Sequence, residues 1–195
     1  MKEAKTNLFS VRSMVFTALF AALICIAAPF SIQVGPIPIT LATFAIYLTG
    51  AILGGKRGVL ATTVYILIGA VGLPVFSGFR GGFGALFGPT GGYLIGYIPL
   101  VLITGVFAEM NSQKISRAVV TVIGMILATA ALYAFGTVWY MAVSGNDLVT
   151  ALTACALPFI PGDAIKIACV TALSVPLKAK LNSAMFGTGH NGDRS

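Results

Sequence analysis

The chain has 195 residues, of which 57% are hydrophobic and only 9% are charged, and its mean hydropathy is +0.97. This composition excludes an ordinary water-soluble domain, because such domains carry about 25% charged residues. The net charge of +7 indicates membrane orientation rather than nucleic-acid binding, since the basic residues fall in short segments between long apolar runs.

The apolar runs predict an all-α membrane protein, a bundle of six transmembrane helices. Lipid admits only helices and closed barrels, and these runs are continuous rather than alternating, which argues against a barrel. In chain order, the expected spans are residues 13–28, 39–53, 59–71, 93–107, 118–143 and 157–177. The segments between them are expected to be a loop over 30–38, a tight basic turn over 54–58, a glycine-rich stretch over 72–92, a polar linker over 109–117 and a polar loop over 144–153.

The distribution of lysine and arginine predicts the orientation of this bundle. Six spans place both ends of the chain on one side, where ten of the twelve basic residues fall. These ten are Lys2, Lys5, Arg12, Lys56, Arg57, Lys114, Arg117, Lys178, Lys180 and Arg194. Because positive loops stay in the cytoplasm, we expect a multi-pass protein of the cell membrane with both termini cytoplasmic.

The whole chain, residues 1–195, is expected to form a single membrane-embedded domain with cytoplasmic tails over 1–12 and 181–195. The first apolar run has the basic start and apolar middle of a signal peptide, which is the alternative to a retained helix. We expect a retained helix, because removing it would leave five spans and weaken the charge distribution.

Groups that serve catalysis or metal binding are sparse. The three cysteines, Cys25, Cys155 and Cys169, lie in or beside apolar segments without metal-ligand spacing, and His190 has no second ligand or base beside it. A partial phosphate-binding motif over 50–57 lacks the Ser or Thr that it requires. We therefore expect no enzyme, no metal and no cofactor, and any ATP hydrolysis must come from another chain.

A charged pair interrupts the last apolar run. Asp163 and Lys166 are three residues apart, so on a helix they share a face and can pair. Each such charge costs roughly 2.5–3.5 kcal/mol at the centre of a membrane helix. Pro158 and Pro161 precede the pair and predict that the helix starts or kinks there. The pair is a candidate polar binding site, and the alternative is a structural ion pair between helices.

The glycine-rich stretch carries Arg80, the only cation expected on the outer side. A guanidinium can hold a carboxylate through two parallel hydrogen bonds, and Phe76, Phe79 and Phe83 flank Arg80 as candidates to cover an apolar moiety. The alternative is a solvated loop arginine. Glycines recur four residues apart over 84–96. This spacing favours close packing where the chain is helical and a loop that covers a pocket where it is not.

Small residues four apart also occur in the first span, at Ala18 and Ala22. They form a smooth stripe on a helix, against which another helix can pack closely. From spacing alone, that second helix is either internal or part of a partner protein.

Two strings resemble signature stretches of the BioY family, the biotin-binding substrate subunits (S-components) of energy-coupling-factor (ECF) transporters. They are Gly88-Pro-Thr-Gly-Gly-Tyr-Leu94 and Pro158-Phe-Ile-Pro-Gly-Asp-Ala-Ile-Lys166. Gly72-Leu-Pro-Val-Phe76 also fits. Ala18-x-x-x-Ala22 resembles the S-component motif that docks the transmembrane coupling subunit. The resemblance covers nearly the whole chain.

The resemblance implies capture of biotin from outside by a six-helix bundle. Its implied partners are a transmembrane coupling subunit and two ATPase subunits, besides the lipid bilayer, with no role for nucleic acid. By similarity, Asp163 and Lys166 bind biotin, and the outer loop after the third span closes the pocket.

The chemistry of biotin fits the candidate residues. Asp163 would accept from the ureido N–H groups, Lys166 would donate to the ureido carbonyl, and Arg80 would bind the carboxylate. The aromatic side chains proposed to cover the fused rings are Phe79, Phe83 and Tyr93. Three alternatives remain open: another vitamin on the same scaffold, a stand-alone facilitator that needs no ATPase, and a membrane enzyme that uses Asp163 as an acid or base.

Overall fold

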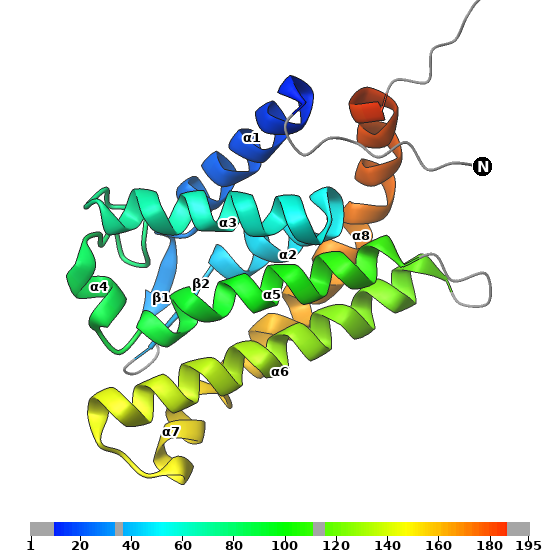
Figure 1. Cartoon of the computed structure of the whole chain (residues 1–195). Helices are drawn as coiled ribbons and strands as arrows, with labels where there is room; N and C mark the ends of the chain where they lie inside the picture. The colour runs from blue at the N-terminus through cyan, green and yellow to red at the C-terminus, as the bar shows by residue number, and fades with distance from the viewer. Residues whose placement is uncertain (1–9, 34–36, 111–115, 187–195) are drawn as a thin grey trace, which may run out of the picture.

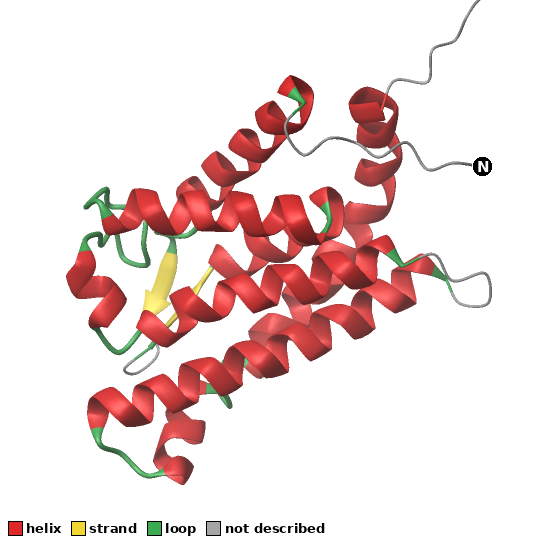
Figure 2. Ribbon diagram, in the orientation of Figure 1, coloured by secondary structure: helices red, strands yellow, loops and turns green. Residues whose placement is uncertain are grey.

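Helices dominate the part of the chain that the computed structural model describes, residues 10–33, 37–110 and 116–186. These residues form eight helices and one two-stranded antiparallel sheet, and Figure 2 colours the helices red and the strands yellow. The elements are α1 (Val11–Ala27), β1 (Ser31–Gln33), β2 (Pro38–Thr40), α2 (Ala42–Leu53), α3 (Gly55–Ala70), α4 (Phe83–Phe87), α5 (Gly91–Glu109), α6 (Arg117–Ser144), α7 (Leu148–Cys155) and α8 (Ile160–Phe186).

The helices α3, α5 and α6 lie roughly parallel in Figure 1, and α1 leaves the bundle at an angle. The most extensive packing is between α5 and α6, and α5 also contacts α2 and α3. The short elements α4, β1, β2 and α7 gather at one end of the bundle, at the left of Figure 1. Residues of α4, β1 and β2 at this end line the cavity of the candidate site.

Glycines of α5 make its close packing against α6 possible. A Cβ atom on Gly92 would lie 2.3 Å from the Cβ of Trp139, and one on Gly96 would lie 2.9 Å from Cδ1 of Leu132. Both distances are too short for a real side chain. The close packing predicted from the four-residue glycine spacing is therefore confirmed for these two positions.

The core is centred on α2 and its neighbours α3 and α5, and it contains buried tyrosines among aliphatic side chains. Tyr47 and Tyr65 are fully buried. A buried phenol needs a hydrogen-bond partner, and the Tyr47 hydroxyl lies 2.6 Å from the Thr129 hydroxyl. This hydrogen bond joins α2 to α6 across the bundle.

Two helices, Gly91–Glu109 and Ala118–Ser144, are long and apolar enough to cross a membrane among the described residues, and a third span is possible if α7 and Ile160–Ser174, bent by 44°, act together. The helices α1 and α2 are apolar but shorter. At 12 residues, α2 is only about 18 Å long, less than the roughly 30 Å of a hydrocarbon core. A mostly helical protein with membrane-spanning character is thus supported, whereas six spans and cytoplasmic termini stay predictions.

The predicted second span is wrong at its start. Residues 38–40 form β2, which pairs with β1 in the register Ser31↔Thr40 and Gln33↔Pro38. Apolar composition alone places Ile39 in the helix, because a short strand and the start of a helix look alike in composition. The hairpin places the backbone of residues 31–40 over one end of the bundle.

Two predicted irregular segments also contain helix. Of the basic turn predicted over 54–58, only Gly54 lies outside the helices. Its φ of +83° lets α3 begin at the next residue. The predicted polar loop over 144–153 ends early, because Gly145 closes α6 in a left-handed conformation and α7 follows from Leu148. The glycine-rich stretch likewise contains the short helix α4.

The predicted tails are only partly described. Residues 181–186 of the predicted C-terminal tail are helical and continue α8. The remaining tail residues 1–9 and 187–195, which include His190, lie outside the described residues.

Candidate functional site

A cavity lies between the β-hairpin, the loop after α3 and the helices α2, α5, α6 and α8. Its free space is about 860 Å³, including the solvent at its mouth. Apolar and aromatic side chains make up much of its wall: Ala28, Ile37, Pro38, Ala42, Tyr65, Phe76, Ala85, Tyr93, Leu94, Tyr97, Leu132, Tyr133 and Phe159. The polar side chains are fewer: Gln33, Thr40, Thr43, Ser77, Arg80, Thr90, Asp163 and Lys166. Such a lining is typical of a small-molecule site.

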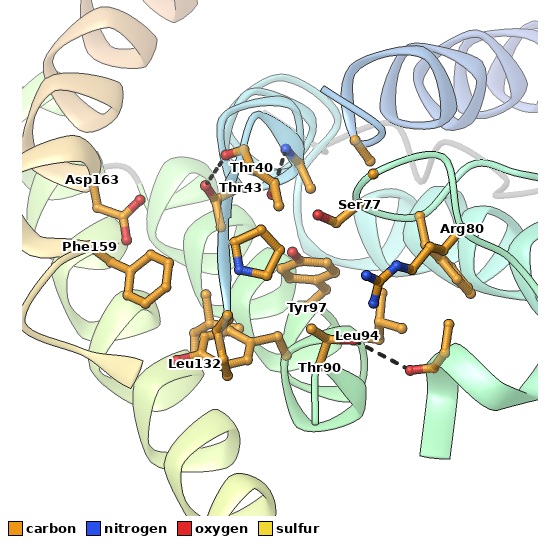
Figure 3. Close-up of a pocket in the computed structure, with 18 of the residues that line it drawn as sticks. Thr40, Thr43, Ser77, Arg80, Thr90, Leu94, Tyr97, Leu132, Phe159 and Asp163 are labelled. Carbon is orange, nitrogen blue, oxygen red and sulfur yellow. Dashed lines mark hydrogen bonds between the residues drawn. The ribbon is translucent and has the colours of Figure 1, made fainter. Parts of the chain in front are cut away.

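The charged pair predicted from the sequence lies at one side of this cavity. Helix α8 begins at Ile160, and Pro161 lies in its first turn. Proline has no backbone N–H, but the N–H groups of a first turn have no partner within the helix, so no hydrogen bond is lost. The first turn directs Asp163 into the cavity (Figure 3). One turn on, the Lys166 Nζ donates to Asp163 Oδ1 at 3.1 Å.

Two further helices contribute to this polar cluster. The Tyr133 hydroxyl, from α6, donates to Asp163 Oδ2 at 2.7 Å. The Lys166 Nζ also donates to the Thr43 hydroxyl, from α2, at 2.8 Å. Asp163 is only 4% exposed. Its charge is therefore balanced by Lys166 and held by donors on two helices, as a buried carboxylate requires.

Tyr133 and Asp163 also separate the cavity from a second hollow. Both residues line an apolar groove between α6 and α8, whose other lining residues include Ile126 and Ala168. Tyr133 and Asp163, joined by their hydrogen bond, therefore border both the cavity and this groove.

The opposite side of the cavity is formed by the loop after α3. Arg80 lines the cavity, with its guanidinium pointing inward beside Tyr97 in Figure 3. Residues 76–80 form a tight hairpin, because Phe76 N–H donates to the Arg80 carbonyl at 2.8 Å and Arg80 N–H donates back at 3.3 Å. The Phe76 ring is buried against Tyr65 and anchors this hairpin to α3.

The three predicted aromatic residues have different positions. Tyr93 lines the cavity, and its hydroxyl donates to the Cys155 carbonyl. Phe79 and Phe83 are 62% and 66% exposed and do not line the cavity. Phe79 instead meets Phe30 edge-to-face, with ring centroids 5.8 Å apart. Their predicted contact with a ligand has no support in this geometry.

Several lining residues were not predicted from the sequence. Tyr133 and Thr43 hold the charged pair, and Tyr97 and Phe159 supply aromatic wall. One sequence signal does exist: a tyrosine or threonine within an apolar span brings a hydroxyl that needs a partner when buried.

No group of three or more potential metal ligands occurs among residues 10–33, 37–110 and 116–186. The Ala18–Ala22 stripe lies away from the cavity, on the exposed face of α1. Ser13, Thr17, Phe20, Ala21 and Ile24 form the buried face of that helix. Among the described helices, therefore, the stripe is not an internal packing surface.

A family model described as BioY matches residues 1–183 of the chain. The Biotin transporter BioY of Thermotoga maritima is 38% identical over 168 residues, which cover 86% of this chain and 96% of that relative. This chain belongs to the BioY family. A second BioY relative, the Biotin transporter BioY of Rhizobium etli, is 37% identical over 84% of this chain and 91% of its own length.

A solved structure agrees with the BioY assignment. The crystal structure of the S-component for biotin from an ECF-type ABC transporter matches with a TM-score of 0.79 and 28% identity, over 90% of this chain and 95% of that one. The resemblance stated from the two signature strings is thereby confirmed, as is the expectation that a BioY protein is not an enzyme.

Proposed function

We propose that the chain captures biotin and takes it up across the cytoplasmic membrane, as the substrate-binding subunit of an ECF-type transporter. Membership of the BioY family and the likeness to a biotin S-component support this function. The proposed partners are a transmembrane coupling subunit and two ATPase subunits.

The unused hydrogen-bonding capacity of the Asp163–Lys166 cluster carries the proposal. A carboxylate offers about four acceptor positions, and an ammonium offers three donors. Tyr133 and Lys166 occupy two positions on Asp163, and two of the Lys166 donors point to Asp163 and Thr43. Acceptor positions on the carboxylate and one donor on the ammonium therefore remain. The ureido ring of biotin is complementary, with two N–H donors and one carbonyl acceptor.

The rest of the cavity matches the rest of biotin. The aromatic rings of Tyr93, Phe159 and Tyr133 lie next to the charged cluster. The ring centroid of Phe159 is 6.1 Å from that of Tyr93 and 6.5 Å from that of Tyr133. They would cover the fused rings and the thioether. Arg80 lies on the opposite side, where the valerate chain would bring its carboxylate.

Uptake into lipid vesicles tests the function and separates it from a stand-alone facilitator. Vesicles that contain this chain with its coupling and ATPase subunits should accumulate labelled biotin only when ATP is supplied to the ATPases. Vesicles with the chain alone should bind biotin without accumulating it. Accumulation by the chain alone would favour the facilitator, and uptake of another vitamin in preference to biotin would refute the substrate.

Arg80 is predicted to read the carboxylate of biotin. Charge-assisted hydrogen bonds contribute roughly 1.5–3 kcal/mol each. The parent protein should therefore bind biotin methyl ester at least about tenfold more weakly than biotin. In Arg80→Ala that difference should shrink to less than about threefold, as measured by calorimetric titration of both ligands. If the methyl ester binds more weakly than biotin by the same factor in both proteins, Arg80 does not bind the carboxylate.

A further inference from the structure

One side chain in the cavity wall has a hydrogen-bonding group with no partner. The Oγ of Ser77 is buried, and none of the described residues accepts from it or donates to it. A buried hydroxyl without a partner is unfavourable, and its presence in a native structure asks for an explanation. A bound ligand that completes the hydrogen bond is one such explanation.

Ser77 differs from the other buried hydroxyls that lack a partner among the described residues. Those are Ser13, Thr62, Thr104 and Thr137. All four lie within helices, and none lines the cavity. Ser77 lies in the hairpin over residues 76–80 and does line the cavity. Ser77 is therefore the one residue in this set that lines the cavity.

The backbone around Ser77 is fixed by several contacts. The Phe76–Arg80 bridge closes the hairpin, and Gly78 N–H donates to the Pro29 carbonyl at 3.0 Å. Phe79 adopts a φ of +59°, which is rare for a bulky residue and strained. This conformation accompanies the contact of its ring with Phe30 outside the cavity. A hairpin held in this way keeps its cavity-facing groups in place before a ligand arrives.

Ser77 and Arg80 share this hairpin and face the same space. Figure 3 shows the Ser77 hydroxyl and the Arg80 guanidinium pointing into the cavity from one side, with Asp163 across from them. A hydroxyl donor and a guanidinium on the same side of a cavity suit an anionic group with two oxygens, which can accept from both.

We propose that Ser77 is a specificity residue for the ligand carboxylate, donating its O–H to one carboxylate oxygen while Arg80 binds the group as a cation. This inference rests on the proposed function, because biotin brings its carboxylate to this side only if its ureido ring lies against Asp163. It explains the buried hydroxyl as a group that is completed by the ligand.

The test compares two ligands in two variants by calorimetric titration of the full chain in detergent. The ligands are biotin and the analogue in which a methyl group replaces the carboxyl group. Ser77→Ala should bind biotin at least about tenfold more weakly than the parent, as expected for a lost bond to a charged group. Its affinity for the methyl analogue should fall by less than about threefold.

Ser13→Ala is the matched control, since it removes another buried hydroxyl without a described partner, far from the cavity. It should leave the affinity for both ligands unchanged. Without ligand, the Tm of Ser77→Ala should equal or exceed that of the parent, because the variant removes an unsatisfied group.

Two results would overturn the inference: no loss of biotin affinity in Ser77→Ala, or an equal loss for both ligands. Each of these leaves the proposed function intact if the parent binds biotin. Failure of the parent itself to bind biotin would overturn both.

Discussion

Replacing Asp163 by Asn should weaken biotin binding by at least about a hundredfold. The change removes the negative charge that Lys166 pairs with, so the bonds from the ureido N–H groups to this side chain are no longer charge-assisted, a loss of roughly 1.5–3 kcal/mol each. It also gives the side chain an N–H₂ group where Tyr133, Lys166 and the ureido ring all donate. Calorimetric titration of the purified variant measures the loss.

Asp147→Asn is the control for this prediction, because it makes the same chemical change at an exposed aspartate after α6. Its affinity for biotin should equal that of the parent. Thermal unfolding of each variant shows whether the sample is folded. A folded Asp163→Asn protein that binds biotin within about threefold of the parent would remove Asp163 from the binding site.

Changing both Ala18 and Ala22 to Leu should abolish assembly with the coupling subunit while sparing biotin binding. Both alanines lie on the exposed face of α1, and close helix contact depends on small side chains. Two leucines there would hold a partner helix away. Co-purification of the coupling subunit with the tagged variant measures assembly, and titration of the isolated variant measures biotin binding.

A matched double substitution is available on α8. Ala168 and Ala172 are also exposed and four residues apart, so changing both to Leu adds the same volume to a different face. This control should assemble normally. Normal assembly of the Ala18→Leu/Ala22→Leu variant would contradict the docking assignment, and equal loss in both double variants would point to a general effect of added bulk.

Local features of the site could be predicted from the sequence. The three-residue spacing of Asp163 and Lys166 predicted their contact, and the prolines before them predicted where α8 begins. Both inferences depend only on helix geometry and proline chemistry. For the same reason, the apolar runs located most helices to within a few residues.

Contacts between distant segments could not be predicted in this way. Thr43 is 123 residues from Lys166 in sequence, and Tyr133 is 30 residues from Asp163. Their meeting depends on how α2, α6 and α8 pack, which no local pattern specifies. The Phe79 prediction failed for a related reason: its backbone conformation in the hairpin accompanies a ring position against Phe30, whereas the neighbouring Phe76 points inward.

A titration of the purified chain alone with biotin, in detergent and by calorimetry, tests the central claim most directly. The cavity, the Asp163–Lys166 cluster and Arg80 all come from this one chain, so it should bind biotin tightly and one-to-one without its partners. A folded sample that shows no heat of binding with biotin would contradict the account.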